Sequence, residues 1–402
     1  MRGQPLEPAR ADASAPPGQG PERTDTVVIG AGPAGLAAAA CLGRAGVPYV
    51  VLEREQQVAP VWRRHYERLC LHTVKEQSAL PFMPFPDDWP RYVPRARFVE
   101  YLERYAERFG IRPRFGQEVT ELVPAAGAGW RVRTAAGSRL EAERVVVATG
   151  YTCEPCVPSW PGQEHYRGQV LHSARYRNGA PFSGRRVLVV GAGNSGAEIA
   201  LDLWEAGARP ALSVRGPVHV VPRDLLGTPA QRSAILLSKL PLWLADAIGS
   251  TLARLAMGDL ERYGLRRPRC GPLTQVVRYG RIPWIDIGTV ALIKQGQLPV
   301  FPGIERFTER GVRFAGGREE EFDAVLLATG YRARLDRLLA GAAELTDERG
   351  YPRWHGREVP GRPGLYFIGF ANPISGALRE IALEARRIAA AIAARRGTVP
   401  QG

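Results

Sequence analysis

Two clusters of glycine in the sequence have the spacing of a phosphate-binding turn. They are Gly30, Gly32 and Gly35, and Gly191, Gly193 and Gly196. In a G-x-G-x-x-G turn the first glycine permits the sharp bend, the second lets a pyrophosphate approach the backbone, and the third lets the next helix pack close to the preceding strand. The helix N-terminus points unpaired N–H groups and a positive dipole end at the phosphates. The spacing therefore predicts two dinucleotide sites.

The residues that end the next strand distinguish the two sites. In the first unit Glu53, followed by Arg54, closes a strand predicted at 47–53, eighteen residues after Gly35. A carboxylate there can accept hydrogen bonds from a pair of ribose hydroxyls. In the second unit the strand predicted at 211–214 contains Ser213 and is followed directly by Arg215. A guanidinium can bind a 2′-phosphate that a carboxylate would repel. The first site is therefore expected to hold FAD or NAD and the second NADP, although Arg215 could also be a merely exposed side chain.

Strand–turn–helix units are needed to hold these turns, and the flanking residues predict them. Apolar runs at 26–29 and 187–190 read as buried strands, each leading through its glycine turn into an Ala-rich helix. Residues 119–147 alternate apolar and polar side chains, which indicates further strands. Residues 364–370 read as a strand and 377–395 as a helix. The N-terminus of this last helix could face an electron-rich ring, or the helix could simply close the first domain.

Both units also end alike, in the sequence Ala-Thr-Gly-Tyr. Gly150 lies 120 residues after Gly30, and Gly330 lies 139 residues after Gly191. A strand that stops at a glycine brings its backbone close to a ligand, so Thr149 and Thr329 occupy corresponding places in two related modules. The repeat predicts an α/β fold with two Rossmann-like dinucleotide-binding domains.

The expected domain boundaries follow from the repeat. Residues 1–23, rich in Ala, Pro, Gly and Gln, resemble neither a signal peptide nor an anchor and are expected to be a disordered tail. Residues 24–180 and 325–402 are expected to form a discontinuous FAD-binding domain. The NADP-binding domain, residues 181–324, is inserted in it. A helical insertion at 225–262, containing two packed helices, accounts for the extra length of the second unit, with a membrane-surface role as a minor alternative.

Composition limits the function classes. With 402 residues, 45% of them apolar, the chain can form two full cores. The formal charge of +14 is carried by arginine, since the sequence has only three lysines. That charge suits polyanionic cofactors or a solubilising surface, while no basic block or known module supports nucleic-acid binding. Five scattered cysteines fit a reducing cytoplasm rather than a disulfide framework. No run is long enough for an integral membrane segment, and no metal site is expected.

Three further features could carry chemistry. Trp62 could cover an adenine or flavin ring, or be ordinary packing. His72 lies in the Pro- and aromatic-rich stretch 69–89, a loop that could touch cofactor or substrate, although a lone histidine is often structural. Cys153 and Cys156 have the spacing of a redox dithiol, but no helix begins there to lower a thiol pKa, so two incidental thiols remain the alternative.

A third motif carries a resemblance to a known family. Tyr166, Gly168, His172 and Tyr176 match the pattern Phe-x-Gly-x-x-x-His-x-x-x-Phe/Tyr, with Tyr166 in place of Phe. It lies between the two glycine turns, as in the class B flavin-dependent monooxygenases, which the chain therefore resembles. Within that class the sequence is most similar to the YUCCA flavin monooxygenases, which convert indole-3-pyruvate to indole-3-acetate. The resemblance covers about residues 25–395 and rests on the stretches 71–75, 80–86, 191–196, 213–220, 261–268 and 286–289.

The resemblance implies a glutathione-reductase-like fold and a specific chemistry. NADPH at the second site would reduce FAD, reduced FAD would react with O₂ to give a flavin C4a-peroxide, and oxygen would pass to a small-molecule substrate. With a 2-oxo acid, loss of CO₂ would follow. Where related enzymes carry a catalytic Asn, this sequence has His72, so heteroatom oxygenation does not carry over directly. No general base is assigned.

The residues expected at the sites follow from the motifs and the resemblance together. His72 and Asn194 are the candidates at the reaction centre. The expected cofactor-binding residues are Gly30, Gly32, Pro33, Ala34, Gly35, Glu53, Arg54, Trp62, Val119, Thr149, Gly150, Gly191, Gly193, Asn194, Ser195, Gly196, Ser213, Arg215, Thr329, Gly330 and Gly369.

Two other functions stay open at this point. One is a pyridine-nucleotide disulfide reductase that uses Cys153 and Cys156. The other is a non-enzymatic basic binding protein on a nucleotide-binding fold, which would bind polyanions in a salt-sensitive way.

Overall fold

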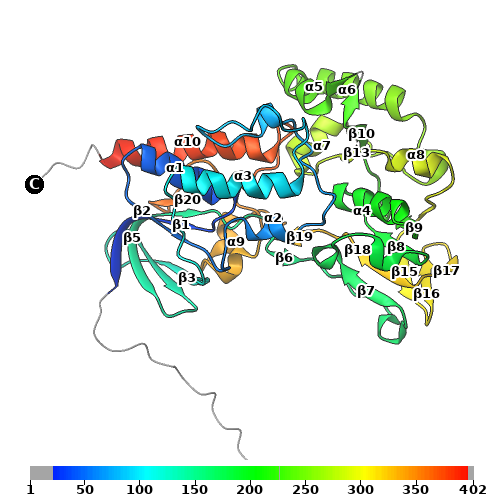
Figure 1. The fold of residues 1–402 in the computed structure, drawn as a ribbon, viewed down its shortest axis with the longest axis horizontal. Helices are drawn as coiled ribbons and strands as arrows, with labels where there is room; N and C mark the ends of the chain where they lie inside the picture. Colours follow the sequence, from blue (N-terminus) through cyan, green and yellow to red (C-terminus); the bar gives the residue numbers. More distant parts are fainter. Residues whose placement is uncertain (1–20, 226, 397–402) are drawn as a thin grey trace, which may run out of the picture.

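The computed structural model describes residues 21–225 and 227–396, which form two α/β domains side by side (Figure 1). Most of the expected tail, residues 1–20, lies outside the described residues. The boundary of that tail at residue 23 differs from the structure, because strand β1 (Glu22–Ile29) already begins at Glu22. Glu22 pairs there with Leu140 of the neighbouring strand and bonds to Arg114, so the sheet extends further than the apolar run alone indicates.

A mixed sheet forms the first domain, with strand order β2–β1–β5–β4–β3 and β20 beside β5. The bounds not yet given are β2 (Tyr49–Leu52), β3 (Val119–Pro124), β4 (Trp130–Thr134), β5 (Arg139–Val147) and β20 (Leu365–Phe367). The first half of β5 alternates in burial and lies between antiparallel β4 and parallel β1, whereas its continuously buried second half lies between β1 and β20, both of which are parallel to it. This change matches the usual difference between half-exposed antiparallel strands and fully buried parallel ones.

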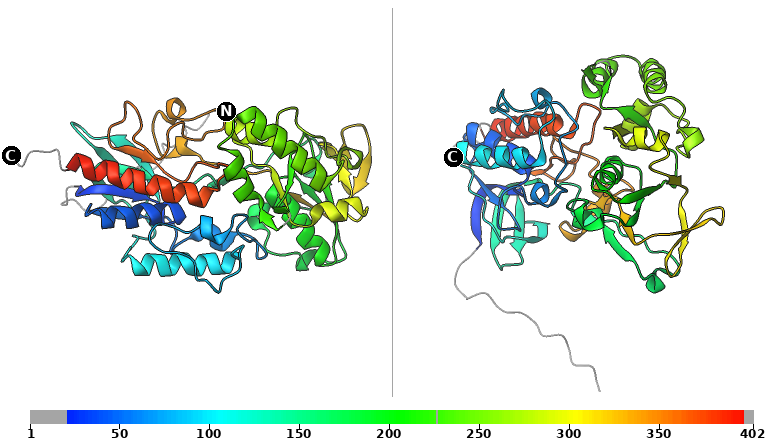
Figure 2. Two further views of the ribbon diagram at one scale, coloured as in Figure 1. Left: turned by 90° about the horizontal axis from the view of Figure 1, so that it is seen from above. Right: turned by 45° about the vertical axis from the view of Figure 1, so that its right-hand side comes forward.

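Three helices cover one face of this sheet, as both views show (Figures 1 and 2). They are α1 (Pro33–Arg44), α3 (Arg95–Arg108) and α10 (Ala377–Arg396). Residues of these helices bury one common core with Val28 of β1. The expected helices after the first glycine turn and at 377–395 are therefore present. The short helix α2 (Pro60–Arg64) and α9 (Ala342–Leu345) complete the domain.

The second domain has a fully parallel sheet in the order β14–β9–β8–β18–β7. Its elements are β7 (Gln169–His172), β8 (Arg186–Val190), α4 (Asn194–Glu205), β9 (Arg209–Ser213), α8 (Thr289–Lys294), β14 (Val300–Phe301) and β18 (Ala324–Leu327), with the meander β15 (Ile304–Phe307), β16 (Gly311–Phe314) and β17 (Glu319–Glu321). Because β7 and β18 both belong to this sheet, it takes in residues on both sides of the expected limits 181 and 324.

Two paired segments connect the domains. β6 (Glu154–Pro155) follows the first Ala-Thr-Gly-Tyr and β19 (Tyr331–Arg332) begins at the Tyr of the second, and the two pair antiparallel. His172 Nε2 contacts the Gly330 carbonyl oxygen at 3.1 Å, while its Nδ1 accepts from the Ala174 N–H. Since Nδ1 accepts, Nε2 carries the proton and donates. The histidine of the third motif thus fixes the point where the chain returns to the first domain.

The helical insertion stands at the top right of Figure 1. It contains α5 (Ala230–Leu237) and α6 (Leu242–Met257) and the pair β11 (Asp224–Leu225) with β12 (Thr228–Pro229). It extends beyond the expected limits 225 and 262, because β10 (Val220–Pro222) pairs with β13 (Trp284–Asp286) and α7 (Pro272–Tyr279) lies between them in the sequence. The two expected helices are therefore present and in contact. Gln231 of α5 ties them to the first domain, since it accepts from the Val74 N–H at 3.0 Å and donates to the Ser375 carbonyl at 2.5 Å. No helix in the described part of the chain is long and apolar enough to span a membrane.

Candidate functional site

The first glycine turn has the geometry that its spacing predicts. Gly30 has a φ of 109°, and a Cβ there would lie 2.8 Å from the Ala148 carbonyl oxygen. A Cβ on Gly35 would collide with the Gly30 carbonyl, because helix α1 packs directly against the turn. A Cβ on Gly32 would meet no atom within 4 Å. Gly32 is thus the position at which the protein itself leaves room for a ligand, while Gly30 and Gly35 serve the fold.

The second turn repeats this arrangement in the other domain. Gly191 has a φ of 109° and faces the Ala328 carbonyl, where a Cβ would lie 2.6 Å from the oxygen. A Cβ on Gly196 would collide with the Gly191 carbonyl, and one on Gly193 would meet nothing within 4 Å. Gly32 and Gly193 are the N-caps of α1 and α4, and neither helix has a side-chain cap. The N–H groups of both first turns are therefore available to an anionic ligand.

A cavity of about 310 Å³ opens at the first turn, and we call it the dinucleotide cavity. The expected cofactor residues that line it are Gly30, Gly32, Pro33, Ala34, Glu53, Arg54, Trp62, Val119, Thr149, Gly150 and Gly369. The Thr149 hydroxyl is buried and has no hydrogen-bond partner among the described residues. A buried hydroxyl without a partner is costly, and it indicates a group that a ligand satisfies. The open space at Gly32 and the unpaired Thr149 hydroxyl fit a bound dinucleotide.

Glu53 lies beneath the first turn and is almost fully buried. One carboxylate oxygen accepts from the Ala31 N–H at 2.7 Å and the other from the Glu55 N–H at 3.0 Å. Each oxygen retains a further lone pair. Glu53 therefore holds the glycine turn in place and can also accept from a ribose hydroxyl in the cavity.

Trp62 of α2 and His65, the residue that follows α2, also line this cavity. The Trp62 ring packs edge-on against Phe98, with centroids 4.5 Å apart, so the two readings of this residue as packing and as a cofactor cover are compatible. Burial, assisted by the nearby Arg95, lowers the pKa of His65 to about 4. His65 is thus a neutral imidazole at physiological pH.

A second cavity of about 370 Å³ adjoins the first, and we call it the apolar cavity. Trp62, Tyr151, Ala377 and Leu378 line both cavities. Helices α5, α6 and α7 supply apolar residues to the far wall, among them Leu237, Leu252, Leu273 and Val276. None of the described lining residues is Lys, Arg, Asp or Glu. The polar side chains among them are Cys70, His72, Thr73, Tyr151, Asn194, Gln231, Ser233 and Asn372. The sequence did not indicate that the helical insertion encloses this space.

The two candidates for the reaction centre both line the apolar cavity. Asn194 is the first residue of α4, and its Oδ1 accepts from the Ile285 N–H at 2.7 Å. This bond fixes the side chain between the second glycine turn and the apolar cavity. His72 enters from the first domain, and its Nε2 contacts Glu198 Oε1 of α4. Glu198 was not among the expected site residues.

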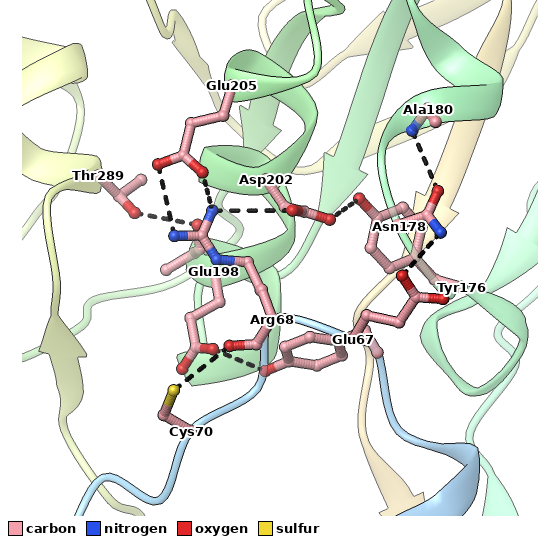
Figure 3. A network of polar contacts seen from close by, with 12 residues as sticks. Glu67, Arg68, Cys70, Tyr176, Asn178, Ala180, Glu198, Asp202, Glu205 and Thr289 are labelled. Atoms are coloured by element: carbon pink, nitrogen blue, oxygen red, sulfur yellow. Dashed lines mark hydrogen bonds and ion pairs between the residues drawn. The ribbon is translucent and has the colours of Figure 1, made fainter. Parts of the chain in front are cut away.

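Glu198 belongs to an acidic face of α4 that holds the two domains together (Figure 3). Glu198, Asp202 and Glu205 follow one another at helical spacing, so they lie on one face. Arg68 reaches Glu205 at 2.8 Å and Asp202 at 3.8 Å, and Asp202 accepts from the Tyr176 hydroxyl at 2.6 Å. The segment that contains Arg68 is thus bound to the helix that carries the second glycine turn.

The residues expected at the second dinucleotide lie around that turn, at the ends of β8, β9 and β18. Arg215 is exposed and has no acidic partner among the described ion pairs, and the carbonyl of Arg215 accepts from Arg266 Nη2 at 3.3 Å. This leaves the Arg215 guanidinium available for a phosphate. The buried hydroxyl of Ser213 donates to the Pro302 carbonyl at 2.8 Å. Thr329 likewise donates to the Cys156 carbonyl.

The N-terminus of α10 lies at the junction of both cavities, which Ala377 and Leu378 line. Glu384, fully buried on α10, accepts from the Gly369 N–H at 2.9 Å and pairs with His355 Nδ1 at 2.5 Å. The Glu384 carboxylate raises the pKa of His355 above 6.5. A raised pKa in the folded state contributes stability that is complete below pH 6.5 and is lost as the pH rises through the folded-state pKa.

Cys153 lines the dinucleotide cavity, and its thiol donates to the Thr149 and Gly150 carbonyls. Burial raises the pKa of Cys153. A dithiol mechanism needs a thiolate and is therefore disfavoured here. All five cysteines are free thiols, and no cluster of His, Cys, Asp or Glu in the described chain has the arrangement of a metal site.

Comparisons with known proteins agree with this geometry. Residues 27–223 match the pyridine nucleotide-disulphide oxidoreductase family. The chain is 44% identical over 355 residues to indole-3-pyruvate monooxygenase YUCCA1 of Oryza sativa subsp. japonica, covering 86% of each chain. It is 43% identical to indole-3-pyruvate monooxygenase YUCCA6 of Arabidopsis thaliana, over 91% of this chain and 89% of the relative. A flavin-containing monooxygenase from Stenotrophomonas maltophilia superposes with a TM-score of 0.72 at 25% identity, over 93% of this chain and 99% of that one.

Proposed function

The chain belongs to the YUCCA family of flavin monooxygenases, and on that premise we propose that it converts an aromatic 2-oxo acid, such as indole-3-pyruvate, to the acid shortened by one carbon. It is a flavin-dependent monooxygenase whose cofactors are FAD and NADPH. The proposed reaction consumes the 2-oxo acid, O₂, NADPH and a proton. It yields the shortened acid, CO₂, water and NADP⁺, so that one oxygen atom of O₂ enters the product and the other leaves as water.

The apolar cavity beside the dinucleotide cavity is the observation that supports this substrate class. Its walls are apolar and carry few polar groups, which suits a flat aromatic body with one polar end. A charged amine would find no carboxylate among the lining residues. His72, which can carry a positive charge, and the amides of Asn194 and Asn372 are the polar side chains suited to an oxo-acid end.

The residues present fit both cofactors. The Gly32 turn, Glu53, Thr149 and Gly369 would hold FAD in the dinucleotide cavity, and the Gly193 turn with Arg215 would hold NADPH. FAD, when bound and reduced, supplies the activation of O₂. The protein contributes binding and exclusion of water: Trp62 and Tyr151 separate the two cavities while lining both, and Gln231 fixes α5 over the apolar cavity.

Within this function His72 and Asn194 are the residues proposed at the reacting end of the substrate. Each is anchored by one defined partner, Glu198 and the Ile285 N–H, and each lines the apolar cavity. The free cysteines support a reducing compartment such as the cytoplasm as the place of action.

A product assay tests the proposal. The purified holoenzyme is supplied with NADPH, O₂ and, separately, indole-3-pyruvate, phenylpyruvate, an aromatic amine, a sulfide and a cyclic ketone. We expect the shortened acid and one equivalent of CO₂ from the aromatic 2-oxo acids. Sulfoxide, N-oxide or lactone formation without turnover of either 2-oxo acid would refute the substrate class.

A further inference from the structure

The contact between His72 and Glu198 joins the two domains inside the active region. His72 lies in the loop after β2 and α2, whereas Glu198 lies on α4, 126 residues further along the chain. His72 Nε2 faces Glu198 Oε1, with side-chain exposures of 17% and 2%. The second carboxylate oxygen of Glu198 accepts from the Tyr66 hydroxyl at 3.2 Å.

A carboxylate buried as deeply as Glu198 needs partners for both oxygens. In the described part of the chain, its one ion-pair partner is His72. His72 Nε2 and Glu198 Oε1 are buried and have no other polar partner among the described residues. Because a carboxylate only accepts hydrogen bonds, a proton on Nε2 would satisfy both atoms. Nδ1 is then the ring nitrogen available to a substrate in the apolar cavity, which His72 lines. It accepts a hydrogen bond when the ring is neutral and donates one when the ring carries both protons.

The other titratable groups around this pair do not compete with it near neutral pH. Burial, together with the nearby Glu198, raises the pKa of Tyr66 far above its usual value and raises the pKa of Cys70. His65 is neutral, with its pKa lowered to about 4. The nearby cations Arg68 and Arg223 each have an acidic partner, Glu205 and Asp224.

We propose that Glu198 is the positioning residue that fixes the tautomer and orientation of His72, so that Nδ1 meets the polar end of the substrate. The proposal rests on the proposed function for its substrate. It also gives the placement of Glu198 on α4 a reason: Glu198 lies one helical turn beyond Asn194, at the end of α4 that receives the NADPH pyrophosphate. His72 is therefore held in its working orientation only when the NADPH-carrying helix is docked against the first domain.

A double-mutant cycle tests whether Glu198 acts through His72. The variants are Glu198→Gln, His72→Ala and the combination, measured as product formed per second and as H₂O₂ released per NADPH consumed. We expect Glu198→Gln to lower kcat for product by about tenfold or more, within the range of a positioned proton-transfer group. Added to His72→Ala, the same change should cause no further loss. If the losses multiply, Glu198 has a separate role and the proposal is wrong.

Glu205→Gln is the matched control, because Glu205 lies on the same face of α4 and is ion-paired with Arg68, whereas the acid that contacts His72 is Glu198. It should leave kcat within about twofold. Equal losses in Glu205→Gln and Glu198→Gln would mean that the acidic face only docks the domains, and would overturn the proposal.

A spectroscopic readout keeps the proposal separate from the substrate assignment and from folding of the variants. Nitrogen-15 NMR of the unmodified holoenzyme, with the His72 signals assigned by their loss in His72→Gln, reports which ring nitrogen carries the proton. We expect the Nε2–H form. The Nδ1–H form would overturn the positioning role even if indole-3-pyruvate is the substrate. The H₂O₂ readout of the double-mutant cycle does not depend on which substrate is used. The Nε2–H form, together with non-additive effects on H₂O₂ release, would therefore support the positioning role even if another substrate is found.

Discussion

Replacing Gly32 or Gly193 by valine should remove one cofactor each and leave the fold intact. Both glycines have extended backbone that valine adopts, with φ and ψ of −80° and −175° at Gly32 and −88° and −178° at Gly193. Their Cβ positions meet no protein atom within 4 Å. The added side chain would instead occupy the path of the pyrophosphate to the helix N-terminus.

The size of the effect follows from the hydrogen bonds lost. A hydrogen bond from a backbone N–H to a charged phosphate contributes about 1.5–3 kcal/mol. If the side chain displaces the pyrophosphate from two such groups, binding weakens by about 3–6 kcal/mol, or roughly 10²–10⁴-fold. For Gly32→Val we expect purified protein without bound flavin. For Gly193→Val we expect retained flavin with a raised KM for NADPH or no reduction by it.

The assay is flavin content per polypeptide, together with the rate of flavin reduction by NADPH and the thermal unfolding temperature of each apoprotein. Gly30→Ala provides the contrast, because its φ of 109° and the 2.8 Å approach of a Cβ to the Ala148 carbonyl should destabilise the fold itself. The assignment of the two turns is refuted if Gly32→Val keeps a full complement of FAD, or if Gly193→Val loses flavin to the same extent.

Three further outcomes follow from the site. Arg215→Ala should raise the KM for NADPH about tenfold to a hundredfold and leave that for NADH unchanged, since one charge-assisted contact is lost; an equal loss with both coenzymes would contradict this role. His355→Asn should flatten the decline in thermal unfolding temperature as the pH rises above 6.5, because the pKa of His355 is raised by Glu384 and its contribution is lost there; an unchanged profile would count against it. Replacing Cys153 and Cys156 together by serine should leave NADPH oxidation and product formation within about twofold, whereas abolished turnover would reinstate the dithiol.

The dinucleotide turns are the part of this protein that the sequence determined by itself. The bend at Gly30, the open position at Gly32 and the close packing at Gly35 all depend on residues within one strand, one turn and one helix. The same spacing gives the same geometry at Gly191, Gly193 and Gly196 in a different domain. Local chain geometry is sufficient for these features, since backbone conformation and side-chain size act over a few residues.

Some expected site residues make hydrogen bonds with neighbouring elements that the sequence did not indicate. Ser213 stands at the predicted place after β9, yet its hydroxyl turns to the Pro302 carbonyl beside β14. The strand pairing that brings Pro302 there connects segments 89 residues apart, and no periodicity near Ser213 announces it. The buried acid Glu198 was missed for the same reason. Its position in a predicted helix does not show which residues from other segments contact it.

Only the tertiary structure decided which side chains meet between the domains and what encloses the apolar cavity. His72 with Glu198, Gln231 with Val74 and Ser375, and His172 with Gly330 are contacts between segments far apart in the sequence. They exist because two separately folded sheets dock in one orientation and the helical insertion closes over their junction. That orientation is set by the summed packing of many distant surfaces, so no single stretch of sequence encodes it.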